Sequence, residues 1–171
     1  LEGYGMTETA ALISLNHPFH RARGSIGKVL PGREVRIRDD GEILVRGDTV
    51  STTTWEGGRL RQRDSEWLET GDLASVDEQG NLRYRGRKKD VIVTSAGLNI
   101  YPEDLEAALQ TQPQVKACAV VQTEGRTGPE PIAALVVRDE AEAAEAVRAA
   151  NRNLADFQKI RRWVVWPDAD L

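Results

Sequence analysis

The sequence holds a single cysteine, Cys118, among its 171 residues. One cysteine excludes a disulfide within the chain, and no cluster of cysteine and histidine has the spacing of a zinc site. A chain without disulfides is typical of a reducing compartment, so we expect a cytoplasmic location.

An excess of basic residues is also missing. The 23 lysines and arginines are balanced by 27 aspartates and glutamates, which gives a formal net charge of −4. Proteins that bind nucleic acid through its phosphates usually carry a basic excess or a basic block. The charge balance therefore predicts no nucleic-acid partner. The shares of hydrophobic residues, 40%, and of charged residues, 29%, are typical of a globular protein.

Long apolar runs and a targeting leader are absent as well. No stretch approaches the ~20 apolar residues that a membrane-spanning helix needs, so we expect no transmembrane segment. Peripheral contact with a membrane surface stays open. The first residues lack the basic leader of a signal peptide. The chain opens on Leu1 and its first motif follows almost at once, so we expect its ends to be cuts in a longer chain.

The first half of the chain contains the pattern of β-structure. Apolar and polar residues alternate in two pairs of segments, each pair joined by a turn: 35–37 with 42–45, and 73–76 with 82–85. This spacing predicts two β-hairpins. Residues 47–66, between the hairpins, are polar and rich in glycine, which predicts a long surface loop.

The pattern changes after Gly86. We predict a short strand at 91–93, a tight turn at 95–97 and a helix that begins at Pro102, because proline suits the first turn of a helix. Two strands, a second helix and a last strand follow: 115–121 and 132–137 joined by a loop at 124–131, then 139–154 with Ala144, Val147 and Leu154 on one side, then 163–166. The predicted fold class is α+β, a β-rich half followed by a compact α+β half.

Residues 3–8 place an aromatic ring between glycines and follow it with two oxygen-bearing side chains. The ring of Tyr4 offers a flat face on which a purine base can stack, and Gly5 lets the backbone come close. The hydroxyl of Thr7 can donate to a phosphate oxygen, and the carboxylate of Glu8 suits Mg²⁺. The alternative is a turn with a local capping threonine, and the segment alone leaves both open.

Residues 67–72 end on a carboxylate that follows a glycine turn and enters a strand. Asp72 can accept hydrogen bonds from both hydroxyls of a ribose, as acidic residues of dinucleotide-binding folds do. The alternative is an ordinary Asx turn at the start of a strand.

Residues 86–90 form a basic run at the boundary between the two halves. Alternation predicts Arg83, Arg85 and Arg87 on one face of the strand, with Tyr84 opposite. Such a stripe is a solvated surface patch, a binding surface for a nucleic-acid backbone or acidic partner, or a hinge with a cation aimed at a ligand. A salt-dependent interaction with single-stranded nucleic acid would favour the second interpretation, in which the chain is a binding module that uses this basic stripe.

Five motifs, in their order and approximate spacing, resemble those of the adenylate-forming enzymes: YGMTE at 4–8, GEILVRG at 41–47, TGD at 70–72, GRKKD at 86–90 and AGLNIYPEDLE at 96–106. This family includes acyl-CoA and aryl-CoA synthetases, peptide-synthetase adenylation domains and firefly-type luciferases. The version found here is most similar to long-chain fatty-acyl-CoA synthetases, since four residues separate Ile92 from Gly97.

The resemblance implies a domain organisation. Residues 1–86 would be the C-terminal β-rich part of the large AMP-binding domain, and 87–90 the hinge. Residues 91–171 would be a small mobile C-terminal domain that ends before its catalytic lysine. Lys89 matches the pivot about which that domain rotates, and Gly97 lies on the loop that enters the active site for thioester formation.

The resemblance also implies roles in the first half. Tyr4, beside Gly5, would stack on adenine. Thr7 would contact the α-phosphate of ATP, and Glu8 would help to bind Mg²⁺. Asp72 would hold the ribose hydroxyls, and Arg87 would also approach the ribose.

The implied reaction converts a carboxylic acid, ATP and coenzyme A into an acyl-CoA, AMP and pyrophosphate through an acyl-adenylate, with a fatty acid as the expected substrate. The phosphate loop of the family is missing: residues 125–129 resemble it but lack its lysine and lie between two strands. Lys159 comes too early to be the C-terminal lysine and lacks the preceding glycine. We therefore expect this chain alone to form no acyl-adenylate, and pyrophosphate exchange into ATP would contradict this. An aryl-CoA ligase and a carrier-protein-loading adenylation domain remain alternatives.

Overall fold

The computed structural model describes residues 2–19 and 21–167. The chain divides between Lys88 and Lys89 into two compact units, each with its own hydrophobic core. This division falls inside the segment 87–90. None of the helices among the described residues is long and apolar enough to cross a membrane.

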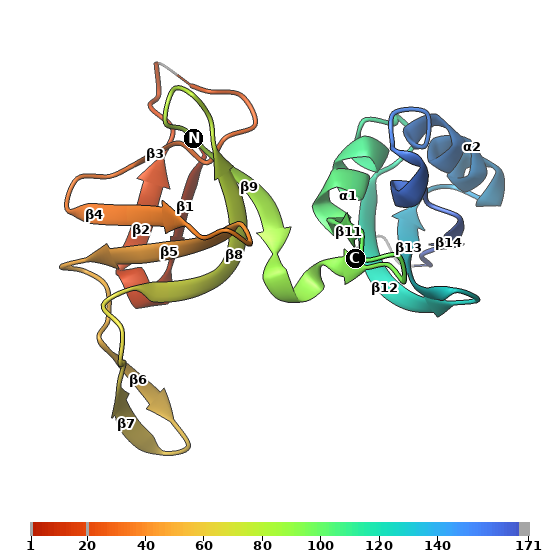
Figure 1. Cartoon of the computed structure of the whole chain (residues 1–171). Coiled ribbons are helices and arrows are strands. Elements are labelled where there is room, and N and C mark those ends of the chain that lie inside the picture. The colour runs from red at the N-terminus through yellow and green to blue at the C-terminus, as the bar shows by residue number, and fades with distance from the viewer. Residues whose placement is uncertain (1, 20, 168–171) are drawn as a thin grey trace. The chain divides into compact units, whose positions relative to one another are not determined.

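The first unit consists of β-sheets (Figure 1). A three-stranded antiparallel sheet contains β1 (Gly3–Met6), β2 (Ala11–Leu15) and β3 (Lys28–Val29). A four-stranded antiparallel sheet, in the order β4-β5-β8-β9, contains β4 (Arg33–Ile37), β5 (Glu42–Gly47), β8 (Leu68–Val76) and β9 (Leu82–Arg87). Both hairpins that the alternation predicts, β4–β5 and β8–β9, are therefore confirmed.

One core joins the two sheets of this unit. Ile13 of β2 packs with Ile43 and Val45 of β5, and all three side chains are fully buried. Tyr4 and Met6 of β1 pack against the same cluster. Because the core holds β1 against the four-stranded sheet, the ring of Tyr4 comes close to residues nearly seventy positions later in the chain.

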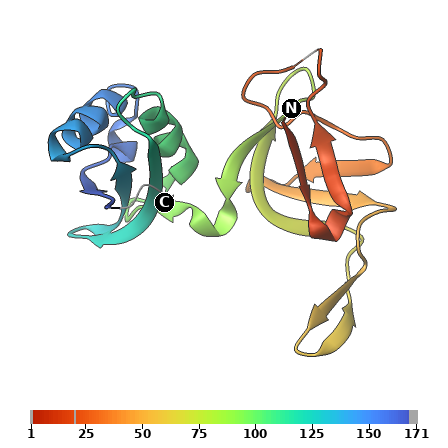
Figure 2. The same ribbon diagram turned by 180° about the vertical axis from the view of Figure 1, so that it is seen from behind.

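The long surface loop predicted at 47–66 is wrong in one respect. It contains a hairpin of β6 (Thr53–Glu56) and β7 (Arg59–Gln62), which projects away from the sheets of its unit in Figures 1 and 2. Gly57 and Gly58 join the strands with φ angles of 57° and 76°. A two-residue turn of this kind needs positive φ at both positions, which the Gly-Gly pair supplies without strain.

The arginine stripe is also not as predicted. Ala74 of β8 faces Tyr84, but Leu73 faces Gly86, so Arg85 is an extra residue in a β-bulge. The bulge reverses the alternation, and Arg87 therefore lies on the same face as Tyr84 rather than on the face of Arg83. Gly86, with φ of 119°, permits this reversal.

Asp77 closes the turn between β8 and β9. Its carboxylate accepts hydrogen bonds from the backbone N–H groups of Asn81, at 2.9 Å, and Gln79, at 3.1 Å. Its Oδ2 also lies 3.1 Å from Nη2 of Arg83. These donors, led by the backbone of Asn81, lower the pKa of Asp77 from its ordinary value. A carboxyl group whose pKa is lower in the folded chain than in the unfolded chain stabilises the fold at pH values above its unfolded-state pKa. This stabilisation is lost as the pH falls through the folded-state pKa.

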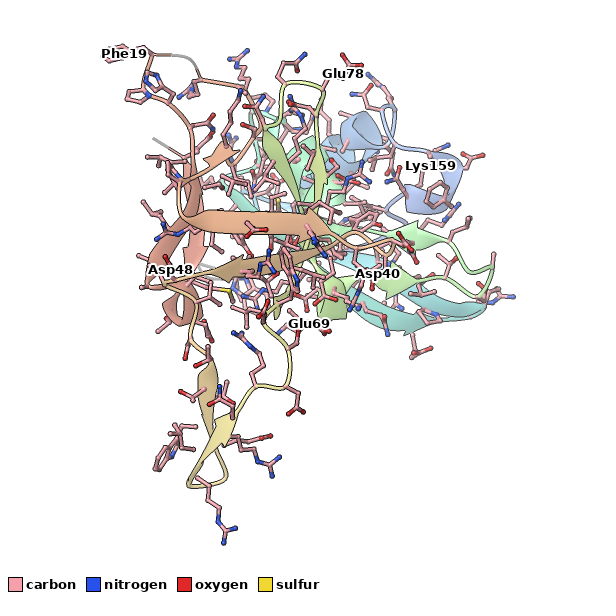
Figure 3. The ribbon with its side chains drawn as sticks, turned by 60° about the vertical axis from the view of Figure 1, so that its left-hand side comes forward. Phe19, Asp40, Asp48, Glu69, Glu78 and Lys159 are labelled. Carbon is pink, nitrogen blue, oxygen red and sulfur yellow. The ribbon has the colours of Figure 1, made fainter. Side chains whose placement is uncertain are left out.

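We therefore expect the free energy of unfolding of the first unit to fall on acidification below about pH 4, and Asp77→Asn to flatten this part of the profile. Urea unfolding at a series of pH values measures the effect. Asp48→Asn changes an exposed carboxylate on the loop after β5 (Figure 3) and serves as the control. An Asp77→Asn profile as steep as that of the native chain would contradict the assignment.

The described part of the second unit contains a three-stranded mixed sheet, a two-stranded antiparallel sheet and two α-helices. Its elements are β10 (Ile92–Val93), β11 (Asn99–Ile100), α1 (Pro102–Gln110), β12 (Ala117–Gly125), β13 (Gly128–Val136), α2 (Glu140–Ala150) and β14 (Arg162–Val165). In the three-stranded sheet, β13 pairs antiparallel with β12 and parallel with β14. Helix α1 contacts β12, α2 contacts β14, and the helices contact each other. The predicted α+β class is confirmed.

The two helices follow the sequence prediction at their starts better than at their ends. Helix α1 begins at Pro102 as expected, and α2 begins after Asp139, whose side chain accepts the N–H of Glu142. Helix α2 ends at Ala150 rather than 154, because the Asn151 side chain bonds both backbone groups of Ile160. Its buried residues are Ala143, Ala146, Val147 and Ala150. Of the side predicted to be apolar, Val147 is buried, and Leu154 packs against the same core from beyond the end of the helix, whereas Ala144 is only half-buried.

The loop predicted at 124–131 is mostly strand, since β12 and β13 run on to Gly125 and Gly128. Pro129 and Pro131 lie in β13, before the point where β14 begins to pair at Ile132. Among the described residues, no strand pairs with β13 at these two prolines on the side of β14, so the N–H that proline lacks costs the sheet no hydrogen bond there.

Candidate functional site

The strand β8 is interrupted by a bulge at Thr70–Gly71–Asp72. Glu42 of β5 faces Leu73 and Leu44 faces Glu69, so three residues of β8 lie opposite Ile43 alone. Thr70 replaces part of the backbone hydrogen bonding between β5 and β8 that the bulge interrupts. Its hydroxyl donates to the carbonyl of Ile43 at 2.9 Å and accepts the N–H of Asp72 at 3.1 Å. Bulges re-aim side chains, and this one sets the direction of the Asp72 carboxylate.

Asp72 is only 4% exposed and touches two of the predicted site residues. Its Oδ2 accepts the hydroxyl of Tyr4 at 2.7 Å, and its Oδ1 lies 2.8 Å from Nε of Arg87. The Arg87 N–H is not aligned for a hydrogen bond, and Oδ1 has no hydrogen-bond partner among the described residues. The ion pair with Arg87 offsets the charge of Oδ1, and the two oxygens of a carboxylate can together accept about four hydrogen bonds, so Asp72 keeps acceptor capacity for a ligand.

The phenol hydroxyl of Tyr4 is the donor in its hydrogen bond to Asp72. Burial raises the pKa of its phenol well above the ordinary value, and the neighbouring carboxylate of Asp72 adds to the rise. The ring centroid of Tyr4 lies 6.5 Å from that of Tyr84, with 37° between the planes. Tyr84 therefore shares the face on which Tyr4, Asp72 and Arg87 meet.

The segment after Tyr4 turns sharply. Gly5 lies at a bulge between β1 and β2, where a Cβ would come within 1.8 Å of the carbonyl oxygen of Ala11. The 3₁₀ turn Thr7–Thr9 follows, with Thr7 and Glu8 exposed. Ala10 and Ala11 have φ of 49° and 83°, which alanine rarely adopts. Strained backbone of this kind gathers at functional sites.

The buried side chain that holds this turn is Thr9, which the sequence reasoning missed. Its hydroxyl contacts the carbonyl oxygens of Met6 at 3.0 Å and Ala11 at 3.1 Å. The capping threonine is thus Thr9, which leaves the hydroxyl of Thr7 available on the surface. A hollow of about 650 Å³ beside the turn is lined by residues that include Gly5 and Thr7.

Glu8 offers a single exposed carboxylate for a cation. No group of three or more Asp, Glu, His or Cys side chains in the part of the chain that the structure describes could hold a metal ion. Mg²⁺ usually takes one or two protein carboxylates and completes its shell with water and phosphate oxygens. Glu8 therefore fits Mg²⁺ as one ligand of a nucleotide-bound ion.

A second buried carboxylate, Glu42, lies beside the bulge and was also missed. It is 3% exposed, and its Oε1 accepts the N–H of Gly71 at 3.1 Å. Its Oε2 contacts Arg38 and lies 2.9 Å from Nζ of Lys88. Glu42 thus bonds to the residue before Asp72 and to the residue after Arg87.

The two remaining predicted residues belong to the second unit. Gly97 lies in the turn between β10 and β11, where its N–H bonds the carbonyl of Thr94 at 2.8 Å. Its φ is +76°, and a Cβ there would meet nothing within 4 Å, so the turn needs glycine for its conformation rather than for space. Lys89 is exposed in a 3₁₀ turn and lines a hollow of about 460 Å³ together with Glu103 and Glu106.

Comparison with known proteins gives a consistent set of relatives, although no protein-family model matches the chain. Long-chain-fatty-acid–CoA ligase FadD15 of Mycobacterium bovis is 42% identical over 125 residues, which are 70% of this chain and 20% of that protein. The long-chain-fatty-acid–CoA ligase of Yersinia pestis is 36% identical over 155 residues, which are 82% of this chain and 27% of that protein.

Solved structures agree with these relatives. The o-succinylbenzoate CoA synthetase of Bacillus subtilis, in complex with its acyl-adenylate intermediate, matches with a TM-score of 0.82 and 31% identity. The match covers 96% of this chain and 37% of that one. The chain belongs to the adenylate-forming ligases. It spans only about a fifth to a quarter of the length of the two curated relatives.

Within this adenylate-forming ligase chain, three of the eight predicted residues meet in one cluster: Tyr4, Asp72 and Arg87. Thr7 and Glu8 lie on the exposed turn that follows Tyr4, and Gly5 fixes the start of that turn. Lys89 and Gly97 lie in the second unit. No signal from periodicity could have found Glu42, because the glutamate of the GEILVRG motif reads as an ordinary first residue of a strand.

Proposed function

We propose that this chain is part of an ATP-dependent acyl-CoA ligase that converts a fatty acid, ATP and coenzyme A into acyl-CoA, AMP and pyrophosphate. The observation that carries the proposal is the Asp72 carboxylate, which Tyr4 and Arg87 hold in place while its Oδ1 receives no hydrogen bond from the described residues. A pair of ribose hydroxyls supplies donors of the required kind. Structures of the Bacillus subtilis o-succinylbenzoate enzyme solved with ATP and magnesium ion and with AMP support a nucleotide as the ligand.

In this proposal the residues of the first unit have separate tasks. Asp72 and Arg87 orient the ribose, and the ring of Tyr4 contacts the adenine. The exposed hydroxyl of Thr7 donates to the α-phosphate, and Glu8 supplies one oxygen to a nucleotide-bound Mg²⁺, which offsets phosphate charge when it is present. Positioning and charge stabilisation are the main requirements of such a reaction.

The second unit is proposed as a small mobile domain, with residues 87–90 as the hinge and Lys89 as the pivot. The position of the division between Lys88 and Lys89 supports a hinge there. Gly97, on the turn between two short strands, is proposed to lie on the loop that serves thioester formation. A hinge needs only a few residues whose φ and ψ change.

A fatty acid is the proposed substrate because the ligases of Mycobacterium bovis and Yersinia pestis carry that activity in their names. An aromatic acid is the second candidate, favoured by the 2-succinylbenzoate–CoA ligase of Listeria monocytogenes, which is 33% identical over 163 residues. The cytoplasmic location, drawn from the single Cys118, is part of the same proposal.

The proposal is tested by titrating the ¹⁵N-labelled chain with AMP and, separately, with 2′,3′-dideoxy-AMP. We expect AMP to shift the amide signals of Tyr4, Asp72 and Arg87. We expect the dideoxy compound, which lacks both ribose hydroxyls, to bind about tenfold or more weakly. Equal binding of the two compounds would contradict the role of Asp72, and no shift with either compound would contradict a nucleotide site in this chain.

A further inference from the structure

Glu42 takes the place of a missing strand neighbour. Because the bulge sets three residues of β8 against Ile43, Gly71 has no ladder partner for its N–H. Oε1 of Glu42 accepts that N–H at 3.1 Å, and Gly71 has φ of +73°. An unpaired backbone N–H in a buried region costs free energy comparable to a lost hydrogen bond. The carboxylate of Glu42 therefore stabilises the bulge that aims Asp72.

The other oxygen of Glu42 holds the end of the first unit. Nζ of Lys88 lies 2.9 Å from Oε2 of Glu42 and 2.8 Å from Oδ2 of Asp40. Arg38 contacts both of these carboxylates and also Glu69. Asp40 lies in the turn between β4 and β5, and Glu69 lies on β8 (Figure 3). Hydrogen bonds from Arg38 and Lys88 lower the pKa of Asp40, and those to Asp40 and Glu42 raise the pKa of Lys88.

Burial separates Glu42 from the other acids of this cluster. The Glu42 side chain is 3% exposed, whereas those of Asp40 and Glu69 are 41% and 66% exposed. Exposed ion pairs contribute little, whereas removal of one partner of a buried pair leaves an uncompensated charge. Among these acids, Glu42 is therefore the one whose loss would change the local structure most.

We infer that Glu42 is a positioning residue that fixes the direction of the Asp72 carboxylate and anchors Lys88, the last residue before the proposed pivot Lys89. One carboxylate thereby couples the proposed ribose acceptor to Lys88, within the proposed hinge segment 87–90. This inference rests on the proposed function for its nucleotide consequence, while its structural part concerns Gly71 and Lys88 alone.

Two variants separate the two bonds of Glu42. Glu42→Gln keeps an oxygen for the N–H of Gly71 but turns an amide N–H₂ toward Lys88, so it releases the lysine. Glu42→Ala loses both bonds. The matched control is Glu34→Gln, which breaks the exposed pair of Glu34 with Arg46, 2.7 Å apart on the same sheet.

Three readouts test the inference: amide hydrogen exchange at Gly71, ¹⁵N relaxation at 87–90, and the ratio of the affinities for AMP and 2′,3′-dideoxy-AMP. We expect Glu42→Ala to speed the exchange of Gly71 and Glu42→Gln to leave it slow. Both should extend backbone motion to Lys88. We expect Glu42→Ala to lower the AMP preference about tenfold by misplacing Asp72, with dideoxy-AMP affinity unchanged. Glu34→Gln should change none of these.

The inference is overturned if Gly71 exchanges at the native rate in a folded Glu42→Ala chain, or if Lys88 is already as mobile as Lys89 in the native chain. It is also overturned if the native chain prefers AMP and Glu42→Ala keeps that preference. If the native chain shows no preference while Gly71 and Lys88 respond as expected, the proposed function fails and the positioning role of Glu42 stands.

Discussion

Asp72→Asn is expected to lower the affinity of the chain for AMP by roughly 10- to 100-fold, because hydrogen bonds to a charged group contribute about 1.5–3 kcal/mol. The amide keeps the size of the carboxylate but removes its charge, and it offers one acceptor oxygen instead of two. Tyr4 donates one hydrogen bond to Oδ2, and Oδ1 receives none from the described residues, so the carboxylate keeps lone pairs for the two ribose hydroxyls.

Isothermal titration with AMP measures this loss, and dideoxy-AMP shows whether it concerns the ribose. Affinity for dideoxy-AMP should stay nearly constant in Asp72→Asn. Glu69→Gln is the matched control, since it neutralises an exposed carboxylate on the same strand, 66% exposed and paired with Arg38. Native affinity for AMP in Asp72→Asn would remove Asp72 from the binding site, whatever else the chain does.

Gly5→Ala is expected to destabilise the first unit by about 3 kcal/mol, at the upper end of the cost of overpacking. The new methyl group would lie 1.8 Å from the carbonyl oxygen of Ala11 and 2.8 Å from Cα of Leu12. These are backbone atoms of β2, which cannot rotate out of the way, so β1 and β2 would have to separate. Tyr4 would lose its place against Asp72 as a consequence.

Urea unfolding followed by NMR signals of each unit tests this prediction. The second unit should unfold at its native midpoint, because its core contains no residue of the first. Gly57→Ala is the control: its φ is +57° with open space around the Cβ position, so it carries only the cost of about 1–2 kcal/mol for a left-handed alanine, in an exposed hairpin. An unchanged midpoint for Gly5→Ala would show that β1 can move.

Sequence reasoning predicts the elements of this protein where local chemistry decides them. The β4–β5 and β8–β9 hairpins follow from alternation and their turns, and α1 starts where Pro102 allows it. The β6–β7 hairpin was missed because its strands bury almost nothing, so they carry no apolar alternation. The end of α2 was missed because a contact between Asn151 and Ile160, made only in the folded chain, decides it.

The candidate site shows a similar division. Tyr4 and Asp72 are 68 positions apart, and only the family resemblance, not periodicity or spacing, relates them. The face of Arg87 could not be read from the sequence, because the bulge at Arg85 reverses the alternation. Glu42 and Thr9 act through bonds to backbone groups that exist only once β1, β5 and β8 are assembled.

The projecting β6–β7 hairpin bears on how much the chain's length can change. All its residues except Thr53 are exposed, and none belongs to the buried core of its unit. The spacing of β5 and β8 is fixed by their pairing in the sheet and not by the number of residues between them. An insertion or deletion at Gly57–Gly58 would therefore leave that spacing unchanged. This segment is a natural place for a peptide tag or a fluorescent reporter that leaves the surroundings of Asp72 intact.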